Sequence, residues 1–125
     1  AFLRFHRAQY ADADQAAWLP DYFAGLVARG DLFGVVVDGR LVSVADVPDI
    51  PYMSDLVAEP GIATLAGYRR RGYATAAVGA LLAHLLAEGK VPLWSCGAHN
   101  TASRRLAERL GFRKLADVIT VTLQP

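Results

Sequence analysis

The sequence predicts an α/β fold in which helices flank a mixed, mostly antiparallel sheet, all within a single domain. Two β-branched runs, 32–37 and 40–47, are separated by Asp38-Gly39, which is the strongest hairpin signal in the chain. Strand-like and helix-like segments then alternate to the C-terminus, in the order β-α-β-α-β. The 125 residues, 54% hydrophobic and 20% charged, suffice for one globular core.

The first thirty residues carry weaker signals. Residues 2–7 are expected to form a strand. Asp12 with Gln15 three positions later resembles a capping box and predicts the start of a short helix. A proline in the first turn favours a second helix over 20–29, which Gly30 ends.

The middle of the chain predicts a loop, a strand and the longest helix. Two prolines enforce a loop over residues 48–57, and a strand follows at 62–66. The helix runs over 72–88 and stops at Gly89. Its apolar residues form one stripe at helical spacing: Ala74, Val78, Leu81, Leu82 and Leu85.

Three elements are expected in the last third. Residues 91–97 are typical of a buried strand, and Asn100 caps a helix that Gly111 ends. Residues 119–123 are expected to form the final strand.

The junction before the longest helix has the pattern of an anion site. Residues 64–74 read TLAGYRRRGYA, a short strand-like run followed by Arg-x-x-Gly-x-Ala at the helix start. The first N–H groups of a helix lack intrahelical partners and lie at the positive end of its dipole. A diphosphate placed there would meet the amides of residues 71–75, supplied by Arg71, Gly72, Tyr73, Ala74 and Thr75.

The run Arg69, Arg70 and Arg71 has three interpretations: a basic surface, a nucleic-acid patch or a phosphate clamp. The adjoining strand and helix start favour the phosphate clamp. Neither Gly-x-x-x-x-Gly-Lys-Ser/Thr nor Gly-x-Gly-x-x-Gly occurs in the chain, which argues against the common nucleotide-binding loops.

These motifs resemble the GNAT superfamily of acyl-CoA-dependent N-acyltransferases. Arg69, Gly72 and Ala74 fill the three fixed positions of its Gln/Arg-x-x-Gly-x-Gly/Ala motif. Some 26 residues later, Asn100-Thr-Ala-Ser103 and Leu110-Gly-Phe112 resemble the family's second block. The resemblance covers residues 31–125 well and 1–30 weakly. It implies a single GNAT-like acetyltransferase domain over 1–125, with acetyl-CoA as cosubstrate.

The resemblance also implies cofactor contacts outside the helix start. The end of the preceding strand, Thr64, Leu65 and Ala66, would supply a backbone N–H near Leu65 or Ala66 to the thioester carbonyl. Asn100, with Ser103 next to it, would bond the pantetheine arm, although its preference for the N-cap explains it equally well.

The residues for proton transfer are less well defined. Glu59 is the preferred general base and Asp55 the second candidate, either acting directly or through water; a solvated strand-edge acid explains Glu59 equally well. Many relatives carry a tyrosine general acid where this chain has Ala107, so His99 or solvent would serve instead.

Side chains near that centre also have structural interpretations. Tyr68 and Tyr73 fit packing or the adenine side of the cofactor. Cys96 fits a small buried hydrophobe, and His99 fits a polar residue facing solvent.

Two functions remain open. The first is acetyl transfer from acetyl-CoA directly to the primary amine of a small molecule, such as an amino-acid derivative or an antibiotic. The second is a CoA-binding domain with little turnover, as part of a longer protein. The expected partners are acetyl-CoA, a small amine and a second copy of the chain, but no nucleic acid or membrane.

Charge and composition bear on partners and compartment. Residues 1–60 carry a net charge of −5 and residues 61–125 a net charge of +6, which suits a cationic acceptor and a polyanionic cofactor as well as ordinary solvated surface. The lone Cys96 and the lack of a secretory signal or of a membrane-length apolar run favour the cytoplasm. Since Ala1 replaces an initiating methionine, a fragment or a processed start is expected.

Overall fold

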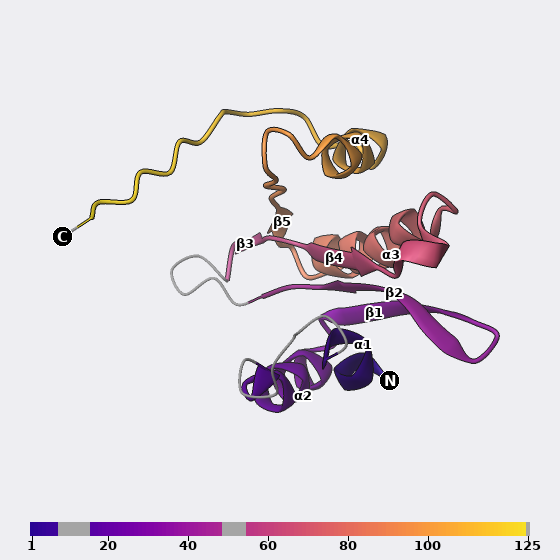
Figure 1. Ribbon diagram of the computed structural model, residues 1–125. Coiled ribbons are helices and arrows are strands. Elements are labelled where there is room, and N and C mark those ends of the chain that lie inside the picture. The colour runs from indigo at the N-terminus through magenta and orange to yellow at the C-terminus, as the bar shows by residue number, and fades with distance from the viewer. Residues whose placement is uncertain (8–15, 49–54, 125) are drawn as a thin grey trace.

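The computed structural model describes residues 1–7, 16–48 and 55–124, and confirms the predicted α/β class (Figure 1). The expected capping-box start at Asp12 and Gln15 lies outside these ranges. Within them, no helix is long and apolar enough to cross a membrane.

The chain begins with helix α1, Phe2–Arg7, so the expected strand at residues 2–7 is wrong. The Phe5 N–H donates to the Ala1 carbonyl oxygen at 3.0 Å. Phe2 and Phe5 are three positions apart, and both pack in a cluster with Leu41 and Val44 of the hairpin. Two apolar residues at this spacing on one face are typical of an amphipathic helix. Six residues are too few for periodicity to separate helix from strand.

Helix α2, Leu19–Arg29, confirms the second predicted helix and its proline in the first turn. Gly30 ends it with φ 73°, a left-handed conformation that favours glycine. The Asp31 N–H then donates to the Leu26 carbonyl oxygen at 3.0 Å, which closes the last turn.

Strands β1, Leu32–Val37, and β2, Arg40–Asp46, form the predicted antiparallel hairpin. Both turn residues, Asp38 and Gly39, have positive φ values of 48° and 74°, which match the right-handed twist of the strands. Strand β4, Gly61–Thr64, pairs antiparallel with β2 and completes a three-stranded sheet in the order β1-β2-β4.

A second, two-stranded sheet joins β3, Val57–Ala58, in parallel with β5, Val91–Pro92. The run 57–64 therefore pairs with β5 at its start and with β2 at its end, with Glu59 and Pro60 between the two halves. The strand expected over 91–97 is much shorter: its last bond is from the Leu93 N–H to the Ala58 carbonyl oxygen, at 2.9 Å.

Helix α3, Tyr73–Ala87, packs on one face of the sheets, and α1 and α2 cover the other (Figure 1). The face of β2 that carries Ala45 meets α3, and the face that carries Val44 meets α1, as alternation along a strand requires. The predicted apolar stripe is confirmed except that Ala77, rather than Ala74, is fully buried.

Helix α4, Thr101–Arg109, begins at the predicted N-cap and ends at Gly111, which has φ 94°. The Phe112 N–H donates to the Ala107 carbonyl oxygen at 3.0 Å across the helix end. The expected final strand at 119–123 is wrong: the segment is exposed and has no strand partner among the described residues.

Candidate acyl-donor and catalytic site

The start of α3 presents backbone donors at the predicted anion site. Gly72 is the N-cap, with φ 81°, and has no side chain with which to cap the helix. The first helical hydrogen bond runs from the Ala76 N–H to the Gly72 carbonyl oxygen at 3.0 Å, so the amides of Tyr73, Ala74 and Thr75 precede the helical ladder. A Cβ at Gly72 would meet no atom within 4 Å, so backbone conformation, and not space, calls for glycine here.

Arg69 and Arg70 shape the turn that leads into the helix. The Arg69 Nε donates to the Thr64 carbonyl oxygen at 3.1 Å, which ties the turn to the end of β4 and leaves the outer guanidinium nitrogens for a ligand. Arg70 has φ 61°, a conformation that costs a side-chain-bearing residue about 1–3 kcal/mol. Left-handed residues in such a turn aim neighbouring amides into a concave anion site.

Two arginine side chains lie against the Tyr68 ring beside the same turn. The guanidinium carbon of Arg71 lies 5.8 Å from its ring centroid, and that of Arg40 lies at the same distance. The Tyr73 ring centroid is 6.4 Å from that of Tyr68. Arg40 comes from the β1–β2 hairpin and was not among the predicted residues, because no local pattern links it to residues 68–71. The turn is thus bordered by exposed cationic side chains from two segments of the chain.

The amide predicted to hold the thioester carbonyl needs a correction. The Leu65 N–H donates to the Val42 carbonyl oxygen at 2.9 Å, so it points into the sheet and is already used. Because amides alternate along an extended strand, the amide of Thr64 points to the opposite edge, whereas Ala66 already begins a 3-10 helix, Ala66–Tyr68. The contact from Arg69 to the Thr64 carbonyl lies on that edge.

The two sheets separate beside this edge. We call the place where β4 parts from the chain that continues from β5 the split. β3 and β5 are joined by bonds from the Val91 N–H to Leu56 O at 2.8 Å and from the Leu93 N–H to Ala58 O. Beyond them β4 pairs only with β2 among the described strands. The strand edge of β4 therefore faces the split.

Glu59 lies where the split begins. Its half-buried carboxylate accepts a hydrogen bond at Oε1 from the Ser95 hydroxyl, which belongs to the chain that continues from β5. Ser95 was not predicted as a site residue, since no sequence pattern pairs it with Glu59. Asp55, the second candidate base, is exposed in the turn before β3, at the closed end of the parallel pair.

The start of α4 is joined to the chain that continues from β5. The Asn100 Oδ1 accepts from the Ser103 N–H at 3.1 Å, so the capping role is confirmed. The Ser103 Oγ accepts from the Trp94 Nε1 at 3.0 Å, and the Trp94 ring packs 5.4 Å from that of Phe112. Trp94, which was not predicted, anchors α4 to the end of β5.

Three further predictions concern this region. His99 is exposed in the turn before α4, as its polar interpretation requires. Cys96 is exposed, so its interpretation as a small buried hydrophobe is wrong: the chain leaves the sheet at Leu93, before reaching it. Ala107 is buried in α4 and brings no acid to the split.

A buried carboxylate that was not predicted lies at the far end of β2. Asp46 is 9% exposed and accepts from the Tyr22 hydroxyl at 2.7 Å. It pairs across the sheet with Gly61, where a Cβ would come within 2.6 Å of the Asp46 Oδ1. His6 lies nearby; burial lowers the pKa of its imidazole and the charge of Asp46 partly opposes this. Within the described residues the buried His6 Nε2 has no hydrogen-bond partner.

A family model for GNAT acetyltransferases matches residues 28–118. The chain belongs to the GNAT acetyltransferase family. No curated protein sequence matches it.

Solved GNAT structures agree with this fold. A GNAT-family acetyltransferase from Novosphingobium aromaticivorans DSM 12444 is 37% identical with a TM-score of 0.58, over 66% of this chain and 36% of that one. A GNAT-family acetyltransferase from Colwellia psychrerythraea is 24% identical with a TM-score of 0.73, over 89% of this chain and 41% of that one. The chain thus spans well under half the length of these two proteins.

A third structure is close in length. The aminoglycoside N-acetyltransferase AAC(6')-Iy, in complex with a bisubstrate analogue of CoA, is 23% identical with a TM-score of 0.69, over 92% of this GNAT chain and 82% of that one. At this identity the similarity shows a shared fold.

Proposed function

We propose that this chain transfers an acetyl group from acetyl-CoA directly to the primary amine of a small molecule. The observation that carries the proposal is the start of α3, where Gly72 at φ 81° exposes helix-terminal amides among clustered arginines. That chemistry fits a diphosphate, because the amides and the guanidinium groups are all donors that favour a negatively charged ligand.

The residues that would hold the cofactor come from the start of α3, the edge of β4 and the start of α4. The amides of residues 71–75 would bind the diphosphate, with Arg71 and Arg40 nearby. The edge of β4 that no described strand pairs with offers backbone donors and acceptors to the amide groups of a pantetheine arm. Asn100 and Ser103, at the start of α4, would be close to the pantetheine arm, although their side chains already bond within the chain.

Each proton in the reaction has a candidate group. Bound acetyl-CoA supplies an activated acyl group; the amine's C–N bond forms as the thioester's C–S bond breaks. Glu59, oriented by Ser95, would take the proton that the amine loses, directly or through water. The amide of Thr64 lies on the β4 edge where the thioester carbonyl would gain negative charge, and the amide of Ala66 follows it at the start of the 3-10 helix. The departing sulfur would take its proton from His99 or solvent.

A cationic small amine fits the acceptor side. The first sixty residues carry a net charge of −5, and Asp46 adds a buried carboxylate at the same end of the sheet as Glu59. The fold shared with an aminoglycoside acetyltransferase supports this class of acceptor but names no substrate.

A CoA-binding module with little turnover is the second candidate. Ala107 supplies no acid, and the chain spans only 36% and 41% of two GNAT relatives. We also propose a homodimer, supported by apolar side chains exposed near the C-terminus, and a cytoplasmic location, supported by the lone free cysteine.

Two measurements on the same protein separate these functions. Calorimetry with CoA tests the cofactor site, and thiol release from acetyl-CoA with a panel of small amines tests turnover. Binding together with amine-dependent thiol release supports the transferase, whereas binding without release for every amine supports the module. A chain that is folded by circular dichroism but does not bind CoA would refute both.

A further inference from the structure

Four arginines gather around the turn before α3 without an acidic partner. Three are consecutive, Arg69, Arg70 and Arg71, and the fourth, Arg40, begins β2 at the tip of the hairpin. All four are exposed. Among the described residues, no ion pair joins any of the four to a carboxylate. This surface therefore concentrates positive charge and is suited to an anionic ligand.

The half-buried ring of Tyr68 keeps Arg40 at this surface. The guanidinium carbon of Arg40 and that of Arg71 each lie 5.8 Å from the ring centroid. A cation–π contact at an exposed site is weaker than a charge-assisted hydrogen bond to phosphate, so an anion can draw either side chain from the ring. The ring thus holds Arg40 close to the turn while its guanidinium donors stay available.

The strand register places Arg40 beyond the end of β4. Ser43 pairs with Thr64, the last residue of β4, and Arg40 comes three residues before Ser43. The proposed pantetheine arm follows β4 from Glu59 to Thr64, and the proposed diphosphate lies at the turn after it. The rest of the cofactor, its adenosine end, would continue in the same direction, past β4. The hairpin turn and the turn before α3 lie at this same end of the molecule (Figure 1).

The adenosine end of coenzyme A carries a third phosphate, on the 3′ position of its ribose. As a monoester this phosphate has a charge of about −1.5 to −2 at pH 7, more than either phosphate of the diphosphate. The amides of residues 71–75, with Arg69 and Arg71, would already serve the diphosphate. We propose that Arg40 binds the 3′-phosphate and thereby makes this chain select CoA over dephospho-CoA.

The chemistry of the side chain suits this role. A guanidinium group presents paired N–H donors that match two phosphate oxygens, and it stays charged at every pH at which the protein is folded. Arg40 comes from a different segment than the rest of the cofactor site, so its loss can remove one phosphate contact and leave the others in place. The inference rests on the proposed acetyl-CoA site and extends it, and the two can fail separately.

Calorimetry with CoA and with dephospho-CoA, which lacks only the 3′-phosphate, tests the proposal. The wild type should bind CoA about 10- to 100-fold more tightly, the gain expected from charge-assisted hydrogen bonds to one phosphate. Arg40→Gln removes the charge and should bring the two affinities to within about threefold of each other by weakening CoA. Its affinity for dephospho-CoA should match that of the wild type, which verifies that the variant is folded.

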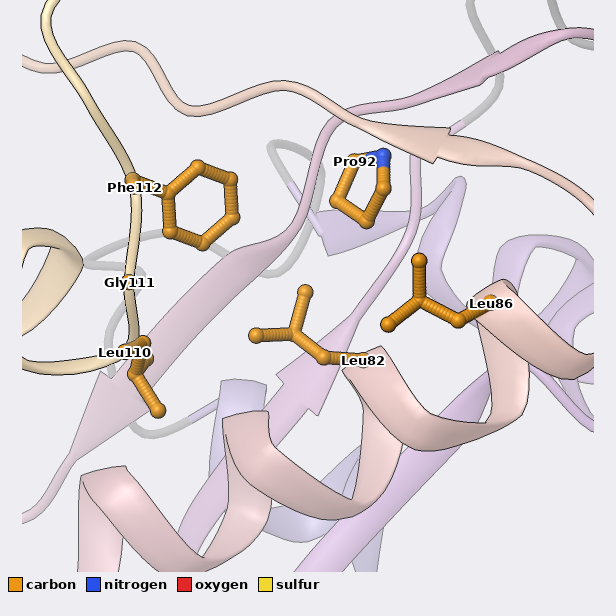
Figure 2. Close-up of a pocket in the computed structure, with 6 residues that line it drawn as sticks. All are labelled: Leu82, Leu86, Pro92, Leu110, Gly111 and Phe112. Carbon is orange, nitrogen blue, oxygen red and sulfur yellow. The ribbon is translucent and has the colours of Figure 1, made fainter.

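Arg109→Gln is the matched control, because it removes the same charge elsewhere on the surface. Arg109 is exposed and is the last residue of α4. The next residue, Leu110, lines an apolar hollow with Leu82 and Leu86 from the second half of α3, away from the start of that helix (Figure 2). Arg109→Gln should therefore keep the wild-type preference for CoA.

Each outcome decides the proposal. Loss of the preference in Arg40→Gln alone supports it. A wild type that binds the two ligands equally would overturn the 3′-phosphate contact but leave the cofactor site, whereas a wild type that binds neither would overturn both. Equal weakening of both ligands by Arg40→Gln would assign Arg40 to the diphosphate instead. An unchanged preference in Arg40→Gln, or an equal loss of it in Arg109→Gln, would show that Arg40 makes no specific contact with the 3′-phosphate.

Discussion

Gly72→Val tests the anion site most directly, because the structure separates the effect on backbone conformation from the effect on space. At φ 81° a β-branched residue is strained by about 1–3 kcal/mol, yet its Cβ would meet no atom within 4 Å. The fold should therefore survive while the turn relaxes and re-aims the amides that follow. Each hydrogen bond lost to a charged phosphate costs about 1.5–3 kcal/mol, so loss of one or two should weaken CoA binding by roughly 10- to 10⁴-fold.

The chain offers a matched control. Gly89, after the C-terminal end of α3, has φ 76° and equally open surroundings, so Gly89→Val carries the same strain at the opposite end of the helix from the proposed phosphates. Urea unfolding should show similar losses of stability for the two variants, and calorimetry should show lost CoA affinity only for Gly72→Val. Equal CoA affinities in the two variants would refute the assignment of the phosphates to this turn.

Three more predictions follow from the site. Arg71→Ala should weaken CoA more than a pantetheine analogue without phosphates, because a clamp acts only on phosphate; calorimetry with both ligands checks this, and equal losses would point to misfolding. Glu59→Gln should lower the amine-dependent rate by roughly 10²- to 10⁴-fold at neutral pH, with a smaller loss at higher pH where more amine is already neutral; a wild-type rate would remove Glu59 from proton transfer. Because burial holds the pKa of His6 below its ordinary 6.5, the unfolded chain binds more protons as pH falls below that value, so stability should drop there. His6→Phe should lose less stability than the wild type between neutral and acidic pH in thermal unfolding, and parallel losses would show that His6 does not titrate as stated.

Local chemistry accounts for what the sequence predicted well. The β1–β2 turn was predictable because Asp38-Gly39 suits two consecutive positive φ values, and the start of α4 because Asn100 accepts from an amide three residues on. The start of α3 was predictable for the same reason, since Gly72 marks a left-handed N-cap.

The predictions that were wrong or incomplete concern features that depend on contacts between distant segments of the chain. The apolar residues within 2–7 fit the periodicity of a strand as well as that of a helix, and packing against α2 favours the helix. Residues 119–123 have the alternation of a strand, but alternation cannot supply a neighbouring strand. The contacts of Arg40 with Tyr68, and of Ser95 with Glu59, join residues 28 and 36 positions apart, which no local pattern reports.

The break at Glu59 and Pro60 also bears on how the molecule folds. The β1–β2 hairpin closes a turn of two residues, whereas β3 meets β5 only after α3 has bridged the intervening chain. Contacts between distant segments must wait for costly loop closure, so we expect the hairpin to form early and the parallel pair late. The split that holds Glu59 exists only once that last pairing is made. The reaction centre would then be assembled at the end of folding, which would keep partly folded chains inactive.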